Sequence, residues 1–348
     1  MTDKVIQKIN KYEQFWRSPA TGRRLVTFSW SKAENYDLMN IADDPQLSFD
    51  FSLAKWNMRN GFEDDSIPML RPEIGTALIA SAFGAELIFR NDNLPAVKSH
   101  PIQSLDDLQK AGKPNSSKDG CFPQINKIID YFIKHRPAGF KVCQCDTQGP
   151  WNTSQLLTGE RIFLDIYDDI DFVCVLLDAV TNFMIKAVKK NKLAISEDNN
   201  YFFLQGAVIR GGSRICNCST DMISPDFYRD YILPRDLRFF EAVGGGMMHI
   251  CGNNSHCIEH FNKIKKLSAL EVNFNYLDIF KVSDILREDV ALLCTGPVEF
   301  PLLTPLGKQT LENFYSGIFP PERNIIFHFN DPSDLNKCNK LYDAIKQN

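Results

Sequence analysis

The stretch ISPDFYRDYILPRDLRFFEAVGGGMMHICG, residues 223–252, contains the signals that decide the fold. Ser-Pro-Asp at 224–226 is typical of a helix start, because the serine can cap free amides, the proline fits the first helical position and the acid complements the helix dipole. The glycines at 244–246 end this helix and lead into MMHIC at 247–251, a run of strand type. The stretch therefore predicts one helix followed by one strand.

Strand-like runs alternate with segments of helical length on both sides of this unit, from about residue 66 onward. Strands that alternate with helices pair in parallel and make an α/β fold. The runs are IPML at 67–70, FKVCQC at 140–145, AVIRG at 207–211, SRICNC at 213–218, MMHIC at 247–251, ALEVNF at 269–274, ALLCTG at 291–296 and NIIFHF at 324–329. Eight such runs predict a (β/α)₈ barrel, also called a TIM barrel. A doubly wound sheet is the alternative, but the glycines at 244–246 precede a strand, whereas a dinucleotide loop follows one.

The first 60 residues are rich in aromatic side chains and less regular than the remainder. We expect residues 1–60 to form an N-terminal cap packed on the barrel. No low-complexity linker divides the chain, so residues 1–348 are expected to form a single barrel domain.

Composition limits the class of partner. The 348 residues are 44% hydrophobic and 24% charged, with a net charge of −4, so there is no basic field to hold a nucleic-acid backbone. The polar N-terminus lacks the apolar core of a signal peptide. The most apolar later stretch, 172–185, contains Asp178 and Asn182 and is too short and too polar to span a bilayer. We therefore expect a cytoplasmic protein with a small-molecule substrate and with neither a nucleic-acid nor a membrane partner.

The ten cysteines are expected to be reduced, because a chain of this length needs no disulfides and no export signal is visible. Several lie in apolar runs, such as VCQC at 142–145 and ICNC at 215–218. Cysteine in such a run is most often a small core hydrophobe.

His249 and Cys251 are the strongest local signal for chemistry. Residues i and i+2 of a strand point to the same side, so both side chains should face the barrel axis. They lie at the end of the strand where barrel enzymes keep their active sites. Imidazole and thiolate ligands suit Zn²⁺, although a buried structural pair is the alternative interpretation.

A third zinc ligand has two candidates. His328 lies in the last strand-like run and is interpreted either as a ligand or as a hydrogen-bonded core histidine, and Cys294 in ALLCTGP is its rival. His256, Cys257 and His260 follow the pair on a segment that looks helical, so we interpret them as surface residues.

Charged side chains at strand ends form a second group. Asp146, Glu271 and Glu299 are candidate catalytic residues, as general acids or bases or as groups that orient a metal ligand, although each can equally be a helix cap or a loop acceptor. Arg71 and Arg214 are candidates to bind a substrate carboxylate or phosphate, with a salt bridge at the barrel rim as the alternative.

Four blocks of the sequence resemble the uroporphyrinogen decarboxylase-like superfamily, which includes uroporphyrinogen decarboxylases and corrinoid-dependent methyltransferases. The blocks are SAFGAELIFRNDNLPAVKSHPIQSLDDL at 81–108, DTQGPWNTSQLLTGERIFLDIYDD at 146–169, the stretch at 223–252, and CTGPVEFPLL at 294–303. The resemblance covers about residues 66–345 and implies a (β/α)₈ barrel with its site at the C-terminal mouth. Gln148, in the second block, is a further candidate for substrate binding.

The chain departs from the decarboxylase branch at two places. The arginine-rich motif that binds substrate carboxylates in those enzymes is absent from FSLAKWNMRNGF at 51–62, where only Arg59 is present. The catalytic tyrosine that follows their glycine-proline segment is also absent, because the residues after Pro150 are WNTSQLLTG. The sequence is therefore more similar to the methyltransferase branch.

Corrinoid-dependent methyltransferases carry a His-x-Cys zinc pair where this sequence has His249 and Cys251. Their third ligand is a cysteine four residues before a proline, and here the residue four before Pro332 is His328. The resemblance thus implies zinc held by His249, Cys251 and His328, with a third ligand of changed type that is still a competent zinc donor.

The function that the resemblance implies is zinc-dependent methyl transfer between a corrinoid, carried by a corrinoid-binding partner protein, and a small thiol acceptor. One alternative is metal-free decarboxylation of a tetrapyrrole or another acidic substrate, in which Arg71 and Arg214 bind carboxylates. A second alternative is a non-catalytic barrel that binds a corrinoid or a tetrapyrrole.

Overall fold

A curved parallel sheet forms most of the barrel wall. In the computed structural model, which describes residues 3–31, 33, 36–299 and 304–347, six parallel strands are hydrogen-bonded side by side. Their order in the sheet is β1 (Arg24–Ser29), β12 (Ile325–Asn330), β11 (Ala291–Pro297), β10 (Leu267–Asn273), β9 (Gly246–Ile250) and β8 (Ser213–Cys216). The register places His249 beside both Cys216 and Glu271.

Two short strands, β2 (Met69–Leu70) and β5 (Lys141–Val142), pair in parallel and close the ring. On one side, β1 is tied to the segment before β2, because the amide of Asp65 donates to the Val26 carbonyl at 2.9 Å. On the other side, the segment after β5 meets β8 through a single bridge between Gln148 and Cys216. The described chain thus forms the predicted (β/α)₈ barrel.

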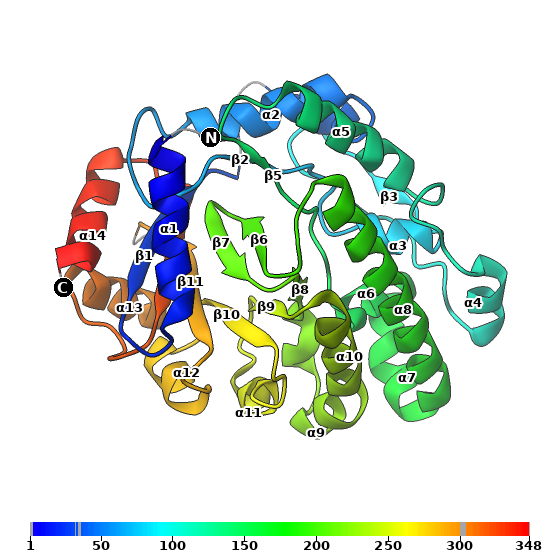
Figure 1. The fold of residues 1–348 in the computed structure, drawn as a ribbon. Helices are drawn as coiled ribbons and strands as arrows, with labels where there is room; N and C mark the ends of the chain where they lie inside the picture. The colour runs from blue at the N-terminus through cyan, green and yellow to red at the C-terminus, as the bar shows by residue number, and fades with distance from the viewer. Residues whose placement is uncertain (1–2, 32, 34–35, 300–303, 348) are drawn as a thin grey trace.

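Helices surround the strands (Figure 1). They are α2 (Pro45–Asn57), α3 (Leu78–Ala82), α4 (Leu105–Ala111), α5 (Phe122–His135), α6 (Pro150–Thr158), α7 (Ile162–Asp168), α8 (Ile170–Ala194), α9 (Pro225–Phe227), α10 (Leu233–Val243), α11 (Ile258–Phe261), α12 (Ile279–Ile285), α13 (Pro305–Tyr315) and α14 (Leu335–Gln347). Shorter elements are the 3₁₀ helices Leu38–Asn40, Gly159–Arg161, Cys218–Met222 and Ser255–Cys257, the π-helical turn Tyr228–Ile232, and the antiparallel pair β3 (Leu87–Ile88) and β4 (Ala96–Val97). As predicted, Ser224 caps the N-terminus of α9, where its hydroxyl accepts a hydrogen bond from the Phe227 amide at 3.1 Å.

The predicted barrel strand at 207–211 is wrong. Residues 207–210 form β7 (Ala207–Arg210), which pairs antiparallel with β6 (Tyr201–Leu204). The two residues between them, Gln205 and Gly206, have φ of 51° and 82°, the left-handed conformations of a tight hairpin turn. Figure 1 shows this hairpin in the middle of the ring of helices, as a plug rather than as part of the wall.

The eighth wall strand is instead β1, which lies within the segment expected to be a cap. The part of residues 1–60 that covers the barrel is α1 (Asp3–Arg17), which buries Tyr12, Phe15 and Trp16 in one cluster with residues of the hairpin. The Trp16 indole donates to the Val208 carbonyl at 2.8 Å and fastens the helix to the hairpin.

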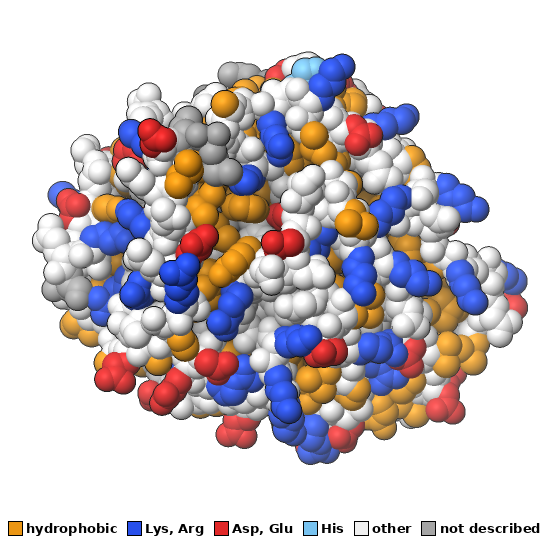
Figure 2. Space-filling view, viewed as in Figure 1, with side chains coloured by type: hydrophobic (Ala, Val, Ile, Leu, Met, Phe, Trp, Pro, Cys, Tyr) orange, Lys and Arg blue, Asp and Glu red, His pale blue; other side chains and the backbone are white. Residues whose placement is uncertain are grey.

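Alternate residues of the wall strands belong to two separate cores. Met247, Ala269, Leu293 and Ile326 pack inside the barrel with α1 and the hairpin. Their neighbours Met248, Leu270, Leu292 and Phe327 pack outside, against the helices. This alternation decides the direction of every strand-end side chain. None of the helices in the described part of the chain is both long and apolar enough to cross a membrane. Basic and acidic side chains are interspersed over the face seen in Figure 2.

Candidate metal centre and active site

Three metal-type donors lie together at the C-terminal ends of β8 and β9. Among the described residues, Cys218, His249 and Cys251 offer ligand atoms that are all within 4.8 Å of one another. His249 lies on β9, and Cys251 follows that strand by one residue. Cys218 begins the 3₁₀ helix that follows β8, the neighbouring strand. Two adjacent strands therefore supply all three donors.

Asn217 holds the Cys218 segment against β9. Its backbone amide donates to the His249 carbonyl at 2.8 Å, and its side-chain amide donates to Asp236 at 2.6 Å. Asp236 also accepts a hydrogen bond from the Tyr228 hydroxyl at 2.8 Å. Burial raises the pKa of Asp236 to about 7, against the opposing effect of these two donors. Buried Asp236 therefore holds Asn217 in place, and with it the segment that carries Cys218.

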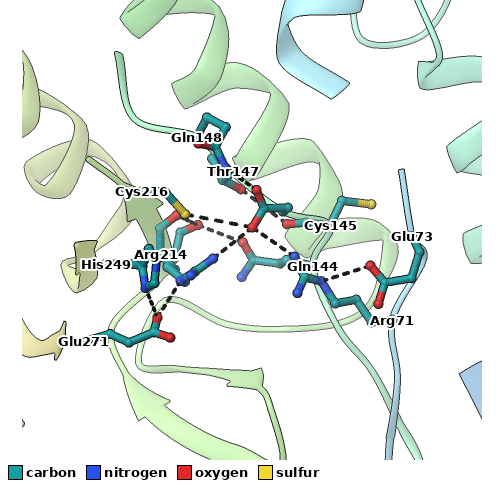
Figure 3. Close-up of polar contacts among 12 residues, drawn as sticks. Arg71, Glu73, Gln144, Cys145, Thr147, Gln148, Arg214, Cys216, His249 and Glu271 are labelled. Carbon is teal, nitrogen blue, oxygen red and sulfur yellow. Dashed lines mark hydrogen bonds and ion pairs between the residues drawn. The ribbon is translucent and has the colours of Figure 1, made fainter. Parts of the chain in front are cut away.

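A chain of charged side chains leads away from His249 across the barrel (Figure 3). His249 Nδ1 lies 2.9 Å from Glu271 Oε2. The same oxygen accepts from Arg214 Nε at 2.9 Å, and Arg214 also donates to Asp146 Oδ1 at 2.8 Å. Arg71 donates to this Asp146 oxygen at 3.0 Å. These side chains therefore connect the segments after β2 and β5 with strands β8, β10 and β9.

The charges in this chain hold one another in their ionised forms. Burial would raise the pKa of Glu271, but Arg214 and His249 outweigh it and hold that pKa well below its usual value. Burial likewise opposes ionisation of Asp146, and Arg214 and Arg71 lower its pKa overall. Burial disfavours protonated His249, yet the neighbouring Glu271 carboxylate raises its pKa. The contact with the Cys218 thiol, together with His249, lowers the pKa of Cys251.

Five of the predicted polar site residues meet in this one place: Arg71, Asp146, Gln148, Arg214 and Glu271. Gln148 joins the group because its amide hydrogen-bonds Asp146. Glu299 does not. It lies partly exposed in the loop after β11. Hydrogen bonds from the Ser333 hydroxyl and from the Ser333 amide, the latter at 3.0 Å, lower its pKa. Sequence spacing could not separate it from the others, because all five charged residues predicted at strand ends look alike before the strand order is known.

A cavity of about 290 Å³ lies beside this chain of charges, with Arg71 in its wall. Ser29, Asn330 and Met69 line it from β1, β12 and β2. Trp30 and Trp56 add aromatic walls, and the further lining residues are Ser31, Ser52, Lys55, Arg59, Glu73, Leu94, Cys143, Gln205 and Gly206. The barrel mouth is therefore divided between a metal-type cluster on β8 and β9 and a cavity on the β12–β1–β2 side.

The structure does not bring His328, expected as the third metal ligand, into the donor cluster. His328 faces the barrel interior from β12, where its Nδ1 lies 2.8 Å from the Thr27 hydroxyl and its Nε2 lies 3.0 Å from the Ser29 hydroxyl. Both ring nitrogens are thus occupied, and burial lowers the pKa of His328 to about 4. The rival Cys294 packs in the outer core with Val272 and Phe327, on the wrong face of its strand.

Cys218 is the donor that sequence reasoning missed. ICNC at 215–218 was interpreted as core, which is right for Cys216, buried at 2% exposure, but not for Cys218. A signal was available, because a Cys-x-Cys and a His-x-Cys end two strands that follow one another in the chain. Of the residues after the pair, His256 is exposed as expected, whereas Cys257 is fully buried and that expectation was wrong.

Comparison with known proteins identifies the class. The sequence profile described as uroporphyrinogen decarboxylase (URO-D) matches residues 5–293, so the chain belongs to this family. A solved methyltransferase structure from Methanosarcina mazei superposes with a TM-score of 0.72 at 17% identity, covering 99% of this chain and 98% of that one. A curated relative, the methylcobamide:CoM methyltransferase MtbA of Methanosarcina acetivorans, is 22% identical over 180 residues. That alignment covers 49% of this chain and 47% of the relative, about half the length of each.

Proposed function

We propose that this chain is a zinc-dependent methyltransferase that moves a methyl group between a corrinoid and a small thiol. The observation that carries the proposal is the cluster of Cys218, His249 and Cys251 at the barrel mouth. One nitrogen and two sulfur donors match the preference of Zn²⁺, and three protein ligands leave the fourth position of a catalytic zinc site open. Zinc bound there would supply one effect, which is to stabilise the thiolate form of a coordinated thiol at neutral pH.

The residues around the cluster prepare it for this role. Glu271 lies against Nδ1 of His249 and favours a proton on that nitrogen, so that Nε2 is left for a metal. Arg214 in turn fixes the Glu271 carboxylate. Because the pKa values of Asp146 and Glu271 are both held low, we assign these two residues to orienting their neighbours rather than to proton transfer.

The named similarity supports the choice of methyl donor and acceptor. The relative from Methanosarcina acetivorans is called a methylcobamide:CoM methyltransferase. The full-length fold is shared with a methyltransferase from Methanosarcina mazei. We propose that a corrinoid-binding partner protein presents the methyl group at the mouth of this barrel, and that a small-molecule thiol accepts it.

Decarboxylation of an acidic substrate is the less favoured function. It requires Arg71 and Arg214 to bind substrate carboxylates. Arg214 is already bonded to Glu271 and Asp146, and Arg71 to Asp146.

The test is metal content and methyl transfer, measured on the same variants. Protein purified without chelator should contain about one zinc ion per chain and should demethylate methylcobalamin in the presence of 2-mercaptoethanol, followed by the absorbance change of the corrinoid. Cys218→Ala and Cys251→Ala should lose both zinc and activity.

Cys294→Ala and His328→Gln are the matched controls, since each removes a rival donor outside the cluster, and both should keep their zinc. If Cys218→Ala keeps its full zinc content and His328→Gln loses it, the ligands are the set expected from the sequence, which are His249, Cys251 and His328. A wild-type protein that binds no zinc, or that binds zinc without demethylating methylcobalamin, would contradict the proposed function.

A further inference from the structure

Cys218 and Cys251 are in contact with each other as well as with His249. Cys216 pairs with His249 in the register of β8 and β9, and continuing that register by two residues on each segment brings Cys218 opposite Cys251. The donor atoms of the cluster are within 4.8 Å of one another, and the two thiols share a hydrogen bond. Both residues are only partly buried, so a small molecule in the barrel mouth can reach them.

The backbone around this pair has the spacing that a disulfide requires. Neighbouring strands lie about 4.8 Å apart, and the two Cα atoms of a disulfide are usually about 4.4–6.8 Å apart. The Asn217 amide donates to the His249 carbonyl at 2.8 Å, and this bond holds the two segments side by side directly before Cys218. Joining the two sulfur atoms therefore requires rotation of side chains and leaves the pairing of the backbone in place.

The other cysteines are less well placed to react. Cys216, the nearest alternative partner of Cys218, is 2% exposed, and its sulfur is directed at Asp146 Oδ1, 3.9 Å away (Figure 3). Residues i and i+2 of an extended segment are also about 6.6 Å apart, close to the upper limit for a disulfide. Cys121 and Cys174 are partly exposed but belong to the outer helices, at the start of α5 and on α8. The buried cysteines are Cys143, Cys145, Cys216, Cys257, Cys294 and Cys338.

We infer that Cys218 and Cys251 are a redox modification site, at which hydrogen peroxide converts the two metal donors into a reversible disulfide. One thiolate attacks a peroxide oxygen, so that the O–O bond breaks, a sulfenic acid forms and hydroxide leaves. The other thiolate attacks the sulfenic sulfur, forms the S–S bond and displaces a second hydroxide. Each hydroxide takes up one proton and becomes water. Two electrons thus pass from the two sulfur atoms to the peroxide.

The consequence for catalysis rests on the proposed function. The disulfide leaves His249 as the one remaining donor of the cluster, whereas catalytic zinc sites use three protein ligands. Two molecules of the small thiol that accepts the methyl group would reduce the bond by thiol–disulfide exchange and become a disulfide themselves. The metal centre is therefore open when this thiol is plentiful and closed when peroxide exceeds it. Formation of the disulfide itself requires neither metal nor turnover.

The test is a peptide map of protein treated with hydrogen peroxide in the absence of other thiols, in zinc-loaded and zinc-free form. After alkylation and tryptic digestion, mass spectrometry should show peptide 215–229 joined to peptide 239–263, and fragmentation should place the bond between Cys218 and Cys251. Two of the ten thiols per chain should be lost. The zinc-loaded protein should release about one zinc ion per chain to a chromophoric chelator, and dithiothreitol should restore both thiols and zinc binding.

Cys218→Ser should abolish this cross-link, and Cys216→Ser is the matched control that should keep it. Cys174→Ser controls for exposure, because this thiol is also partly exposed, and it should lose the same two thiols as the wild type. Circular dichroism checks that the variants are folded, and the map of the wild type depends on no variant.

A bond at Cys216 or Cys257, no loss of thiols, or oxidation of Cys251 that dithiothreitol does not reverse would overturn the inference. A cross-link between Cys218 and Cys251 in protein that binds no zinc or transfers no methyl group would contradict the proposed function alone. Methyl transfer by a wild type that forms no cross-link with peroxide would contradict this inference alone.

Discussion

One oxygen of Glu271 contacts two charged groups from two other strands. Arg214 Nε and His249 Nδ1 both lie 2.9 Å from Oε2, and the Glu271 residue is 1% exposed. In metal sites, a carboxylate at this position fixes the tautomer of a histidine ligand and raises its basicity. Glu271 is thus the residue that connects the charged chain to the donor cluster.

Replacement of Glu271 by glutamine should lower zinc affinity about 10- to 100-fold, because the amide keeps the shape but loses the charge that favours Nδ1–H on His249. Competition against a chromophoric chelator measures this. Glu299→Gln, a carboxylate outside the charged chain, is the control and should leave the affinity unchanged. An unaltered zinc affinity in Glu271→Gln would mean that the contact with His249 is structural only.

The sequence predicted two of the three donors for a physical reason. Side chains two residues apart on a strand point the same way, so His249 and Cys251 could be paired without knowledge of any other strand. The third donor depends on which strand lies next to β9. Cys218 and His328 both end strand-like runs, and only the register of β8 with β9 shows that Cys218 is the neighbour.

At the level of elements, a single bridge takes the place of a ladder in the wall between the segment after β5 and β8. The Gly149 amide donates to the Cys216 carbonyl at 2.7 Å across this seam. A Cβ at Gly149 would lie 2.0 Å from the Asn217 side-chain oxygen and 2.9 Å from the Cys216 carbonyl oxygen. The close approach that joins the two segments is therefore possible only without a side chain.

Gly149→Ala should destabilise the fold by about 1–3 kcal/mol, because the added methyl group pushes β8 and Asn217 outward. Its φ of −66° suits alanine, so the effect is steric and not a backbone strain. Urea unfolding measures the stability, and chelator competition should show weaker zinc binding, since Asn217 precedes Cys218.

A double-mutant cycle with Asn217→Ala provides the control. Removal of the Asn217 side chain relieves the shortest contact, so the double variant should be less destabilised than the two single effects added together. Additive effects would show that the methyl group at position 149 does not meet Asn217.

Element prediction succeeded where a strand lies in a regular helix–strand alternation and failed at two strands whose pairing departs from that alternation, one local and one non-local. MMHIC, ALEVNF, ALLCTG and NIIFHF correspond to β9 to β12. AVIR at 207–210 has the composition of a wall strand, but the Gln205-Gly206 turn pairs it locally with β6. RLVTFS at 24–29 was not predicted as a wall strand. Its partner β12 lies near the other end of the sequence, and no local sequence pattern indicates that pairing.

For the molecule as a whole, the pairing of β1 with β12 joins the first wall strand to the last, and the His328 side chain lies buried between those of Thr27 and Ser29. Both hydroxyls can adapt to a neutral imidazole, whichever nitrogen carries the proton. A protonated ring here would place a charge where burial excludes water, and this is why the pKa of His328 is lowered to about 4.

Global stability should therefore fall as the pH is lowered. The unfolded chain binds a proton on His328 near pH 6.5, whereas the folded chain does so only near pH 4, so protonation between these values favours unfolding. The loss attributable to this residue is about 3 kcal/mol at pH 4 relative to pH 8. Chemical denaturation of wild type and His328→Gln from pH 8 to pH 4 measures it.

In that series, the Gln variant should show a shallower fall, because its amide titrates nowhere in this range and can still bond Thr27 and Ser29. His135→Gln, at an exposed position on α5, is the control and should follow the wild type. Parallel curves for wild type and His328→Gln would show that other groups account for the acid sensitivity.

The donor cluster and the cavity, which share the barrel mouth, are completed at different times during synthesis of the chain. The three sulfur and nitrogen donors all lie between Cys218 and Cys251, on two successive strands. The cavity needs Ser29 and Asn330, which are 301 positions apart. During synthesis, the full donor set is therefore made while more than a quarter of the chain has still to be added, so the donor cluster can come together before the cavity exists.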